Sequence, residues 1–150
     1  MDNKRKVLLI APSLSNSTSS CNGIKVKLIQ QIKSKLDKFG INLTIATLNG
    51  SDPIIQFQND ESSKVWANNT INKEIPLLDI KNIDENEYDG IIIPSYTSIF
   101  KEMNEENNIL NYSLSKLNLQ KKIICCLGNG SYCLTKVKDL TLSFDDQGKE

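Results

Sequence analysis

Apolar residues along this chain gather in short uninterrupted runs, separated by longer segments in which apolar and polar positions are mixed. Residues 7–10, 91–93 and 123–127 form runs that are too short for a helix and contain no polar positions. Such runs are typical of strands buried on both faces of a sheet. Residues 41–47 alternate with a period of two, which predicts a fourth strand.

Two longer segments carry apolar residues every three or four positions, which is the spacing of a helix with one buried face. The first runs from residue 24 to residue 39, and Gly40 stands where a glycine cap ends a helix. The second covers about residues 105–117. Their apolar positions are Ile24, Leu28, Ile32, Leu36 and Phe39, and then Ile109, Leu110, Leu114 and Leu117.

The alternation of strands and helices predicts an α/β fold. A mostly parallel sheet with helices on both faces, a three-layer sandwich of the flavodoxin-like type, fits this order. We expect one domain over residues 1–150, which is long enough to bury a core. In such sheets, ligands bind beyond the carboxyl ends of the strands.

The stretch between residues 51 and 87 has weaker patterns. Residues 53–57 predict a short strand, residues 62–71 a short helix, and the residues from Pro76 onward another extended piece. Trp66 is interpreted as a core residue, with an anchor for a partner as the alternative. The acidic residues are interpreted as solvated loop charges: Asp52, Asp60, Glu61 and those of the run 84–89.

Composition excludes several classes of function. Lys and Arg number 18, as do Asp and Glu, so the positive excess that marks a nucleic-acid surface is missing. The chain contains no histidine, so it cannot build a Cys-His or Ser-His-Asp relay. No apolar run approaches the length of a membrane span, and we expect a cytoplasmic protein without membrane insertion.

The four cysteines lack the C-x-x-C spacing of a zinc site, and their pattern fits a reducing compartment better than a disulfide scaffold. We expect neither a metal nor a cofactor. Cys21 lies in a Ser/Asn-rich loop and is interpreted as an incidental surface thiol, with an oxidisable thiol as the alternative. The others are Cys125, Cys126 and Cys133.

The last apolar run leads directly into Gly128-Asn129-Gly130, which predicts a sharp turn from a buried strand into a helix. Glycine permits positive φ and a close approach of the helix to the strand. Exposed N–H groups at a helix start favour anions. A carboxylate or phosphate pocket lined by Ser95 and Ser131 is therefore one interpretation, and ordinary turn residues are the other.

The segment YDGIIIPS (residues 88–95), followed by a helix and by KKIICCLGNG (residues 121–130), resembles the PfpI and Parkinson-disease-protein-7 superfamily. This superfamily has the class I glutamine amidotransferase-like fold, and the resemblance extends from Lys6 to about Lys138. Its last strand ends in Ala-Ile-Cys-x-Gly, with the cysteine on a strained elbow beside a glutamate of the first helix. The resemblance also implies a homo-oligomer.

Both reactive groups of that superfamily are replaced here. Without gaps, Gly130 matches the closing glycine of the motif, so Gly128 stands at the position of the cysteine. Counted back from Gly40, the position of the glutamate is Leu28. Neither residue can ionise, so the resemblance implies a protein without thiolate chemistry.

One branch of the superfamily, the glutamine amidotransferase-like class 1 domain-containing type, resembles this chain further. Its elbow, Ile-Cys-x-x-Gly-His-Gly, corresponds to residues 124–130, with Asn129 in place of histidine, and Pro94-Ser95 and residues 62–66 are also similar. The branch implies a non-catalytic binding or assembly subunit of an early-endosomal Rab-effector complex that tethers messenger RNA. With zero net charge, we expect protein partners, rather than this chain, to contact RNA.

Relatives in the superfamily continue through further strands after the elbow helix, whereas this chain ends soon after it. Residues 140–144 are predicted as one last strand. The resemblance therefore implies a domain that is short at its C-terminus, with an uncovered sheet edge that favours pairing.

A second register remains open. Cys126-Leu127-Gly128 also reads Cys-x-Gly, which makes Cys126 the nucleophile of a deglycase, a glyoxalase-like hydratase or an amidase. A reactive thiolate needs partial exposure and a nearby positive charge or helix terminus. In the other interpretation, Cys125 and Cys126 are small core residues, as is Cys133.

Overall fold

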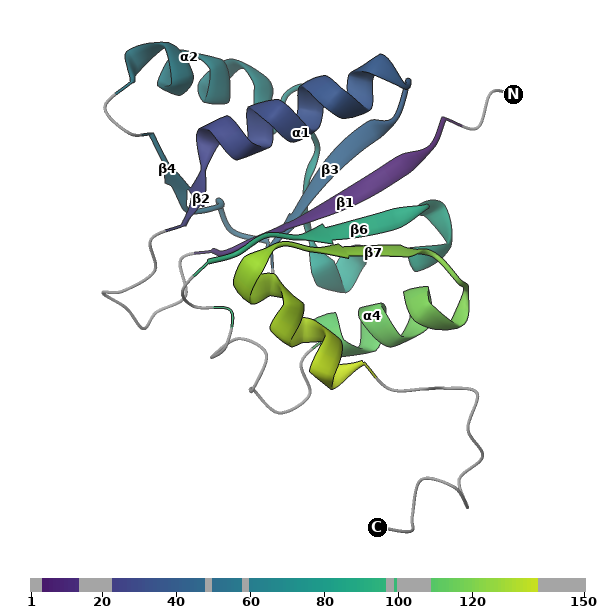
Figure 1. Cartoon of the computed structure of the whole chain (residues 1–150). Helices are drawn as coiled ribbons and strands as arrows, with labels where there is room; N and C mark the ends of the chain where they lie inside the picture. Colours follow the sequence, from purple (N-terminus) through teal and green to yellow (C-terminus); the bar gives the residue numbers. More distant parts are fainter. Residues whose placement is uncertain are drawn as a thin grey trace, which may run out of the picture.

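The computed structural model describes residues 4–13, 23–47, 50–57, 60–96, 99 and 109–137. Its centre is a parallel five-stranded sheet with the order β5-β3-β1-β6-β7, flanked by helices (Figure 1). The predicted α/β, flavodoxin-like fold is confirmed. The strands are β1 (Lys6–Ala11), β3 (Asn42–Thr47), β5 (Leu77–Asp79), β6 (Gly90–Ile93) and β7 (Ile123–Cys126).

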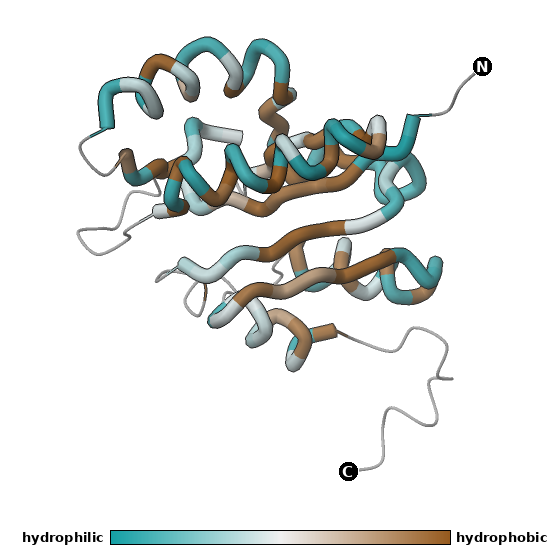
Figure 2. The backbone as a smooth tube through the Cα atoms, turned by 45° about the horizontal axis from the view of Figure 1, so that its top comes forward, coloured by the Kyte–Doolittle hydropathy of each residue, from teal (hydrophilic) through white to brown (hydrophobic). Residues whose placement is uncertain are grey.

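Helices cover both faces of the sheet, which gives three layers (Figure 1). Helices α1 (Val26–Lys38) and α2 (Glu61–Thr70) lie on one face, and α4 (Ile109–Leu119) lies on the other. Successive residues of β1 point to opposite faces, so Leu8 packs in the core under α4 and Leu9 in the core under α1. Figure 2 shows the strands as mostly hydrophobic and the outer helices as mixed.

Short 3₁₀ helices complete the layer around α4. They are η1 (Ile80–Asn82), η2 (Glu85–Glu87) and η3 (Gly128–Lys136), which is the predicted helix after the elbow. Cys133 of η3 is fully buried in the core under α4, as predicted. The predicted helix start at residues 105–108 and the predicted strand 140–144 lie outside the described residues, as does Cys21.

Helix α1 ends at the glycine that the sequence predicts. Gly40 has φ +65, its N–H donates to Asp37 O, and the N–H of Ile41 donates to Leu36 O, both at 3.0 Å. This pair of bonds is the Schellman arrangement, and it requires a left-handed residue at Gly40. Phe39 was predicted on the buried face of α1 but is 81% exposed, because it lies at the C-cap, where the helix has already ended.

The start of α1 also differs from its prediction. Ile24 belongs to a two-residue strand, β2 (Ile24–Lys25), which pairs in parallel with β4 (Ile55–Gln56) in a second small sheet. The N–H of Ile24 donates to Ile54 O at 3.0 Å, and Gly23 has φ +73. The spacing of apolar residues predicts that Ile24 belongs to the helix. Its pairing with the segment around residue 54 places it in a strand instead.

The weaker patterns between residues 51 and 87 are confirmed as β4, α2 and β5. Trp66 is half-buried and packs against the core under α1, in agreement with its interpretation as a core residue. Ile75 between α2 and β5 is fully buried in the same core. The segment therefore adds an element to the α1 layer rather than forming a separate unit.

Two acidic residues interpreted as solvated loop charges have structural roles instead. Asp60 is the N-cap of α2 and accepts hydrogen bonds from the Ser62 N–H at 3.1 Å and from the Ser63 hydroxyl at 2.6 Å. Glu85 is buried and accepts a 2.7 Å bond from the Ser113 hydroxyl. Both roles depend on partners that a charge pattern does not reveal.

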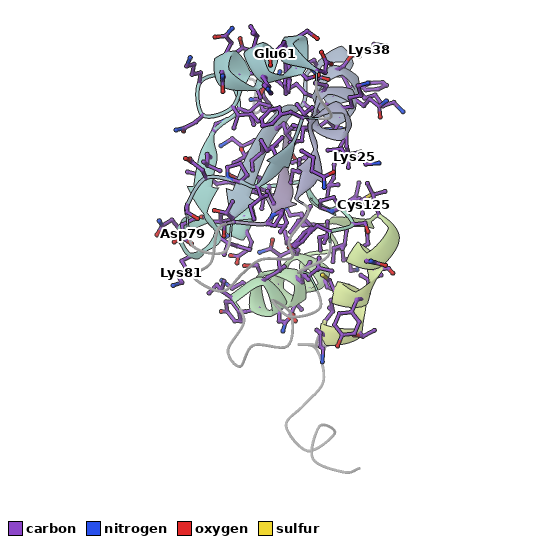
Figure 3. All side chains as sticks on the ribbon, turned by 90° about the vertical axis from the view of Figure 1, so that its left-hand side faces the viewer. Lys25, Lys38, Glu61, Asp79, Lys81 and Cys125 are labelled. Atoms are coloured by element: carbon purple, nitrogen blue, oxygen red, sulfur yellow. The ribbon has the colours of Figure 1, made fainter. Side chains whose placement is uncertain are left out.

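Strand β7 was predicted as a strand buried on both faces, and this prediction is wrong. Of the described residues, β7 pairs only with β6, so it is the outermost strand of the sheet. Ile123 is 72% exposed and Cys125 is exposed, whereas Ile124 and Cys126 are half-buried and pack toward α4. Figure 3 shows Cys125 and Asp79, which belong to the two outer strands, at opposite edges of the sheet.

Candidate functional site: a cleft at the end of β7

The backbone turns sharply where β7 ends. Leu127 is still extended, with φ −114 and ψ 126, and Gly128 has φ +52. The N–H of Gly130 donates to Leu127 O at 3.0 Å and closes the turn into η3. A left-handed conformation costs residues other than glycine about 1–2 kcal/mol. Gly128 therefore allows the elbow to form without this conformational strain.

Gly130 is required for a different reason. A Cβ added to Gly130 would lie 2.3 Å from Ile93 O and 3.0 Å from Pro94 O, which are backbone atoms at the end of β6. Gly130 is buried under this contact and holds η3 close to the neighbouring strand end. Gly130 therefore packs the elbow against the end of β6 and is not among the residues that line the neighbouring cleft.

The sequence-predicted residues Leu28, Ser95, Gly128 and Asn129 line one cleft of about 510 Å³, here called the elbow cleft. The N–H of Asn129 donates to Ser95 Oγ at 3.2 Å. A Cβ on Gly128 would meet Ser95 Cβ at 3.0 Å and Ser95 Oγ at 3.1 Å. The strand end after β6, the first turns of α1 and the elbow thus converge, as expected for the carboxyl edge of a parallel sheet.

Sequence reasoning missed the other side of the elbow cleft. Gly23, Lys25 and Gln56 line it from the β2–β4 sheet, together with Tyr96. Lys25 is exposed. Among the described residues that line the cleft, it alone carries a charge. Figure 3 shows Lys25 and Cys125 toward the same side of the molecule. A two-residue strand has too short a pattern to be predicted, so Lys25 gave no usable signal.

The described lining of the elbow cleft combines apolar and polar side chains. Among the described residues that line it there is no cysteine, aspartate or glutamate. Leu28 and Leu127 supply apolar surface, while Lys25, Gln56 and Asn129 supply polar groups. Ser131 is exposed and is not part of the lining.

Cys126, the nucleophile of the alternative register, does not line the elbow cleft. It is half-buried and packs toward the core under α4. Burial raises the pKa of the Cys126 thiol above its ordinary value, and the neighbouring Cys125 raises the pKa further. Both effects disfavour the thiolate, which is the reactive form of a cysteine.

Within the described part of the chain, no group of three His, Cys, Asp or Glu side chains is placed to hold a metal ion. No helix within the same residues has the length and apolar character needed to cross a bilayer.

The architecture is similar to that of solved structures with an amidotransferase-like fold. Rapid Encystment Protein 24 KDa of Francisella tularensis matches with a TM-score of 0.65 and 20% identity, over 91% of this chain and 64% of its own. Glyoxalase III of Candida albicans matches with a TM-score of 0.64 and 15% identity, over 91% and 62%. An isoprenoid biosynthesis protein with an amidotransferase-like domain from Ehrlichia chaffeensis has a TM-score of 0.59 and 14% identity, over 91% and 67%.

The chain thus spans less than two thirds of the length of the first two of these structures. At such low identities, the likeness establishes the fold and leaves the activity to be argued from the residues. No protein-family model and no curated protein matches the sequence.

Proposed function

We propose that this protein is a non-catalytic member of the amidotransferase-like fold, acting as a binding or assembly subunit. The observation that carries the proposal is the elbow itself. At its left-handed apex stands Gly128, which has no side chain, and the facing position on α1 is Leu28. In the superfamily, these two positions supply a cysteine nucleophile and a glutamate carboxylate. Here Gly128 has only a hydrogen atom as its side chain, and Leu28 has an aliphatic one.

The resemblance in the elbow sequence extends this proposal to a cellular role. We propose a cytoplasmic subunit of an early-endosomal Rab-effector complex that links messenger RNA to endosomes. The equal numbers of acidic and basic residues support contact with RNA through protein partners rather than directly. Affinity purification from cells should recover partners in stoichiometric amounts, and recovery of the chain alone would contradict the assembly role.

The competing function is an enzyme that uses Cys126, and alkylation of the native protein separates the two. Iodoacetamide reacts with thiolates, so exposure and thiol pKa decide the rate. Among the three described cysteines, we expect the exposed Cys125 to react first, Cys126 slowly and the buried Cys133 last, as located by mass spectrometry. Rapid, selective modification of Cys126 at pH 6 to 7 would overturn the non-catalytic proposal.

An activity measurement supplies the second arm. Methylglyoxal turnover by the wild-type protein should not exceed that of Cys126→Ser. Turnover that disappears in Cys126→Ser but persists in Cys125→Ser would establish the enzyme, since the two cysteines are neighbours and differ mainly in the face to which they point.

A further inference from the structure

The first half of β3 has an open edge on the side of β5. The N–H of Asn42 donates at 2.8 Å to the residue before β1, and the N–H of Ile45 donates to Pro76 O at 2.9 Å. In a parallel ladder, successive residues bond to opposite neighbours. The N–H and C=O groups of Leu43 therefore point toward the side of β5, as those of Ile45 do. Strand β5 begins only at Leu77, opposite Ile45, and does not reach Leu43.

Pro76 explains why the ladder stops at this point. If β5 were continued backward, residue 75 would lie opposite Leu43, and the Leu43 C=O would need an N–H from residue 76. Proline has no N–H. The chain turns toward α2 instead, and the N–H groups of Glu74 and Ile75 both donate to Thr70 O at 2.9 Å. Within the described residues, the Leu43 N–H and C=O thus have no hydrogen-bond partner, although Leu43 is only 3% exposed.

A cleft of about 380 Å³, here called the edge cleft, lies against this edge and is bounded by Leu43, Thr44, Pro76 and Tyr88. It is at the amino end of the strands, whereas the elbow cleft is at their carboxyl end. Thr44 and Tyr88 are 5% and 4% exposed, and no described residue forms a hydrogen bond to either hydroxyl. Buried polar groups without partners are rare in proteins. Four of them around one cleft therefore indicate a ligand that supplies the partners.

The charges around the edge cleft are balanced, which favours an uncharged ligand. Lys6 Nζ lies 3.0 Å from Glu87 Oε2, and both residues line the cleft. The other charged residues of the lining are Glu74 and Lys33, whose Nζ is 2.6 Å from Asp37 Oδ1. A charged ligand would meet both signs and would have to compete with these ion pairs.

We propose that the edge cleft binds an extended, uncharged segment of a partner protein, which adds to the edge of β3 as a short strand in line with β5. The backbone of this segment accepts from the Leu43 N–H and donates to the Leu43 C=O, as in other cases of strand addition. Its remaining polar groups bond to the hydroxyls of Thr44 and Tyr88. The inference rests on the proposed binding role, for which it specifies the contact and the chemistry of the partner.

The test is an NMR titration of the isotope-labelled full chain with the capped peptide acetyl-Val-Thr-Val-Thr-amide. We expect the amide signals of Leu43 and Thr44 to shift and to saturate at millimolar peptide, while those of Gly128 and Asn129 in the elbow cleft stay unchanged. Capped tetraproline, whose residues have no N–H, should not bind. The charged analogue acetyl-Val-Glu-Val-Glu-amide should bind more weakly than the uncharged peptide.

Hydrogen exchange provides an independent measurement on the same strand edge. In the free protein, the amide of Leu43 should exchange more than about tenfold faster than that of Ile45, because only Ile45 has a hydrogen-bond acceptor. The uncharged peptide should slow exchange at Leu43 and leave that at Ile45 unchanged.

A variant separates the hydroxyl contact from the fold. Thr44→Val keeps the shape of the side chain and should raise the Kd of the peptide about threefold to tenfold, the effect of one neutral hydrogen bond. It should not lower the thermal stability, because the Thr44 hydroxyl has no described partner to lose. Thr135→Val removes a hydroxyl that donates to Tyr132 O on η3, outside the cleft, and should leave the Kd unchanged.

An unshifted Leu43 signal at millimolar peptide would overturn the proposal, as would equal Kd values for the wild type and Thr44→Val. Leu43 signals that move with protein concentration alone would assign the edge cleft to a second copy of the chain and would overturn it too. The alkylation rate of Cys126 reports on the catalytic alternative separately, so a failed titration and a failed non-catalytic proposal are distinguishable.

Discussion

Gly128 and Ser95 lie next to each other in the wall of the elbow cleft, and Ser95 occupies the direction in which a side chain at residue 128 would project. A Cβ at residue 128 would lie 3.0 Å from Ser95 Cβ and 3.1 Å from Ser95 Oγ. The Ser95 hydroxyl is in turn held by the N–H of Asn129 at 3.2 Å. The missing side chain at the apex and the serine beside it are therefore features of one packed arrangement.

This arrangement predicts an energetic coupling between the two residues. Gly128→Ala should destabilise the protein by about 1–3 kcal/mol, from left-handed strain and from crowding against Ser95. In a Ser95→Gly background the crowding disappears and only the strain remains, so the cost of Gly128→Ala should fall. Urea unfolding of the two single variants and the double variant measures the coupling. Equal costs in both backgrounds would show that Ser95 does not fill this space.

A comparison of two glycines tests the close approach of η3 to β6. Gly130→Ala places a Cβ against backbone atoms, 2.3 Å from Ile93 O, and should cost about 3 kcal/mol or more, because neither backbone can move freely. Gly40→Ala meets nothing within 4 Å and should cost about 1–2 kcal/mol, from its positive φ alone. Thermal and urea unfolding provide both values. A smaller cost at residue 130 than at residue 40 would contradict the contact.

The order of strands and helices was predictable from sequence, because it depends on local periodicity. The apolar runs that became β1, β6 and β7 and the helical spacing that became α1 are present in the residues themselves. The exposure of β7 was not predictable, because an apolar run does not reveal whether a strand is central or at an edge. That difference arises from strand order, which non-local pairing determines.

The elbow cleft was predictable only in part, for a related reason. The sequence pattern locates the strand ends before Gly128 and Ser95 and the helix start at Leu28. In a parallel sheet these positions lie at the same edge, so the contact among the three residues was predictable. Lys25 and Gln56 reach the cleft through a two-residue pairing between β2 and β4, which leaves no periodic signal. The buried role of Glu85 likewise depends on Ser113, which lies 28 residues further along the chain.

That contact between Glu85 and Ser113 predicts a stability effect under α4. Ser113→Ala removes the 2.7 Å bond to Glu85 Oε1 and leaves a buried carboxylate with fewer donors, which should cost about 1–3 kcal/mol. Ser115→Ala is the matched control, because the Ser115 hydroxyl is also in α4 and donates to a helix carbonyl, Asn111 O. Its loss should cost less than about 1 kcal/mol. Urea unfolding at neutral pH compares the two, and equal costs would argue against a structural role for Glu85.

The cap of α2 predicts a dependence of stability on pH in the acid range. Hydrogen bonds from Ser62 and then from Ser63 lower the pKa of Asp60 from 3.8 to about 2. Because the folded-state pKa is the lower one, the stabilisation by this carboxylate is fully present above the unfolded value and is lost as the pH falls through about 2. Asp60→Asn keeps a side chain that can cap the helix but cannot titrate, so its urea midpoint should decline less than that of the wild type between pH 4 and pH 2. The double variant Ser62→Ala, Ser63→Ala keeps the acid and removes the hydroxyl donors, and it should also show a weaker decline. Identical declines for all three proteins would show that the Asp60 cap does not contribute to acid unfolding.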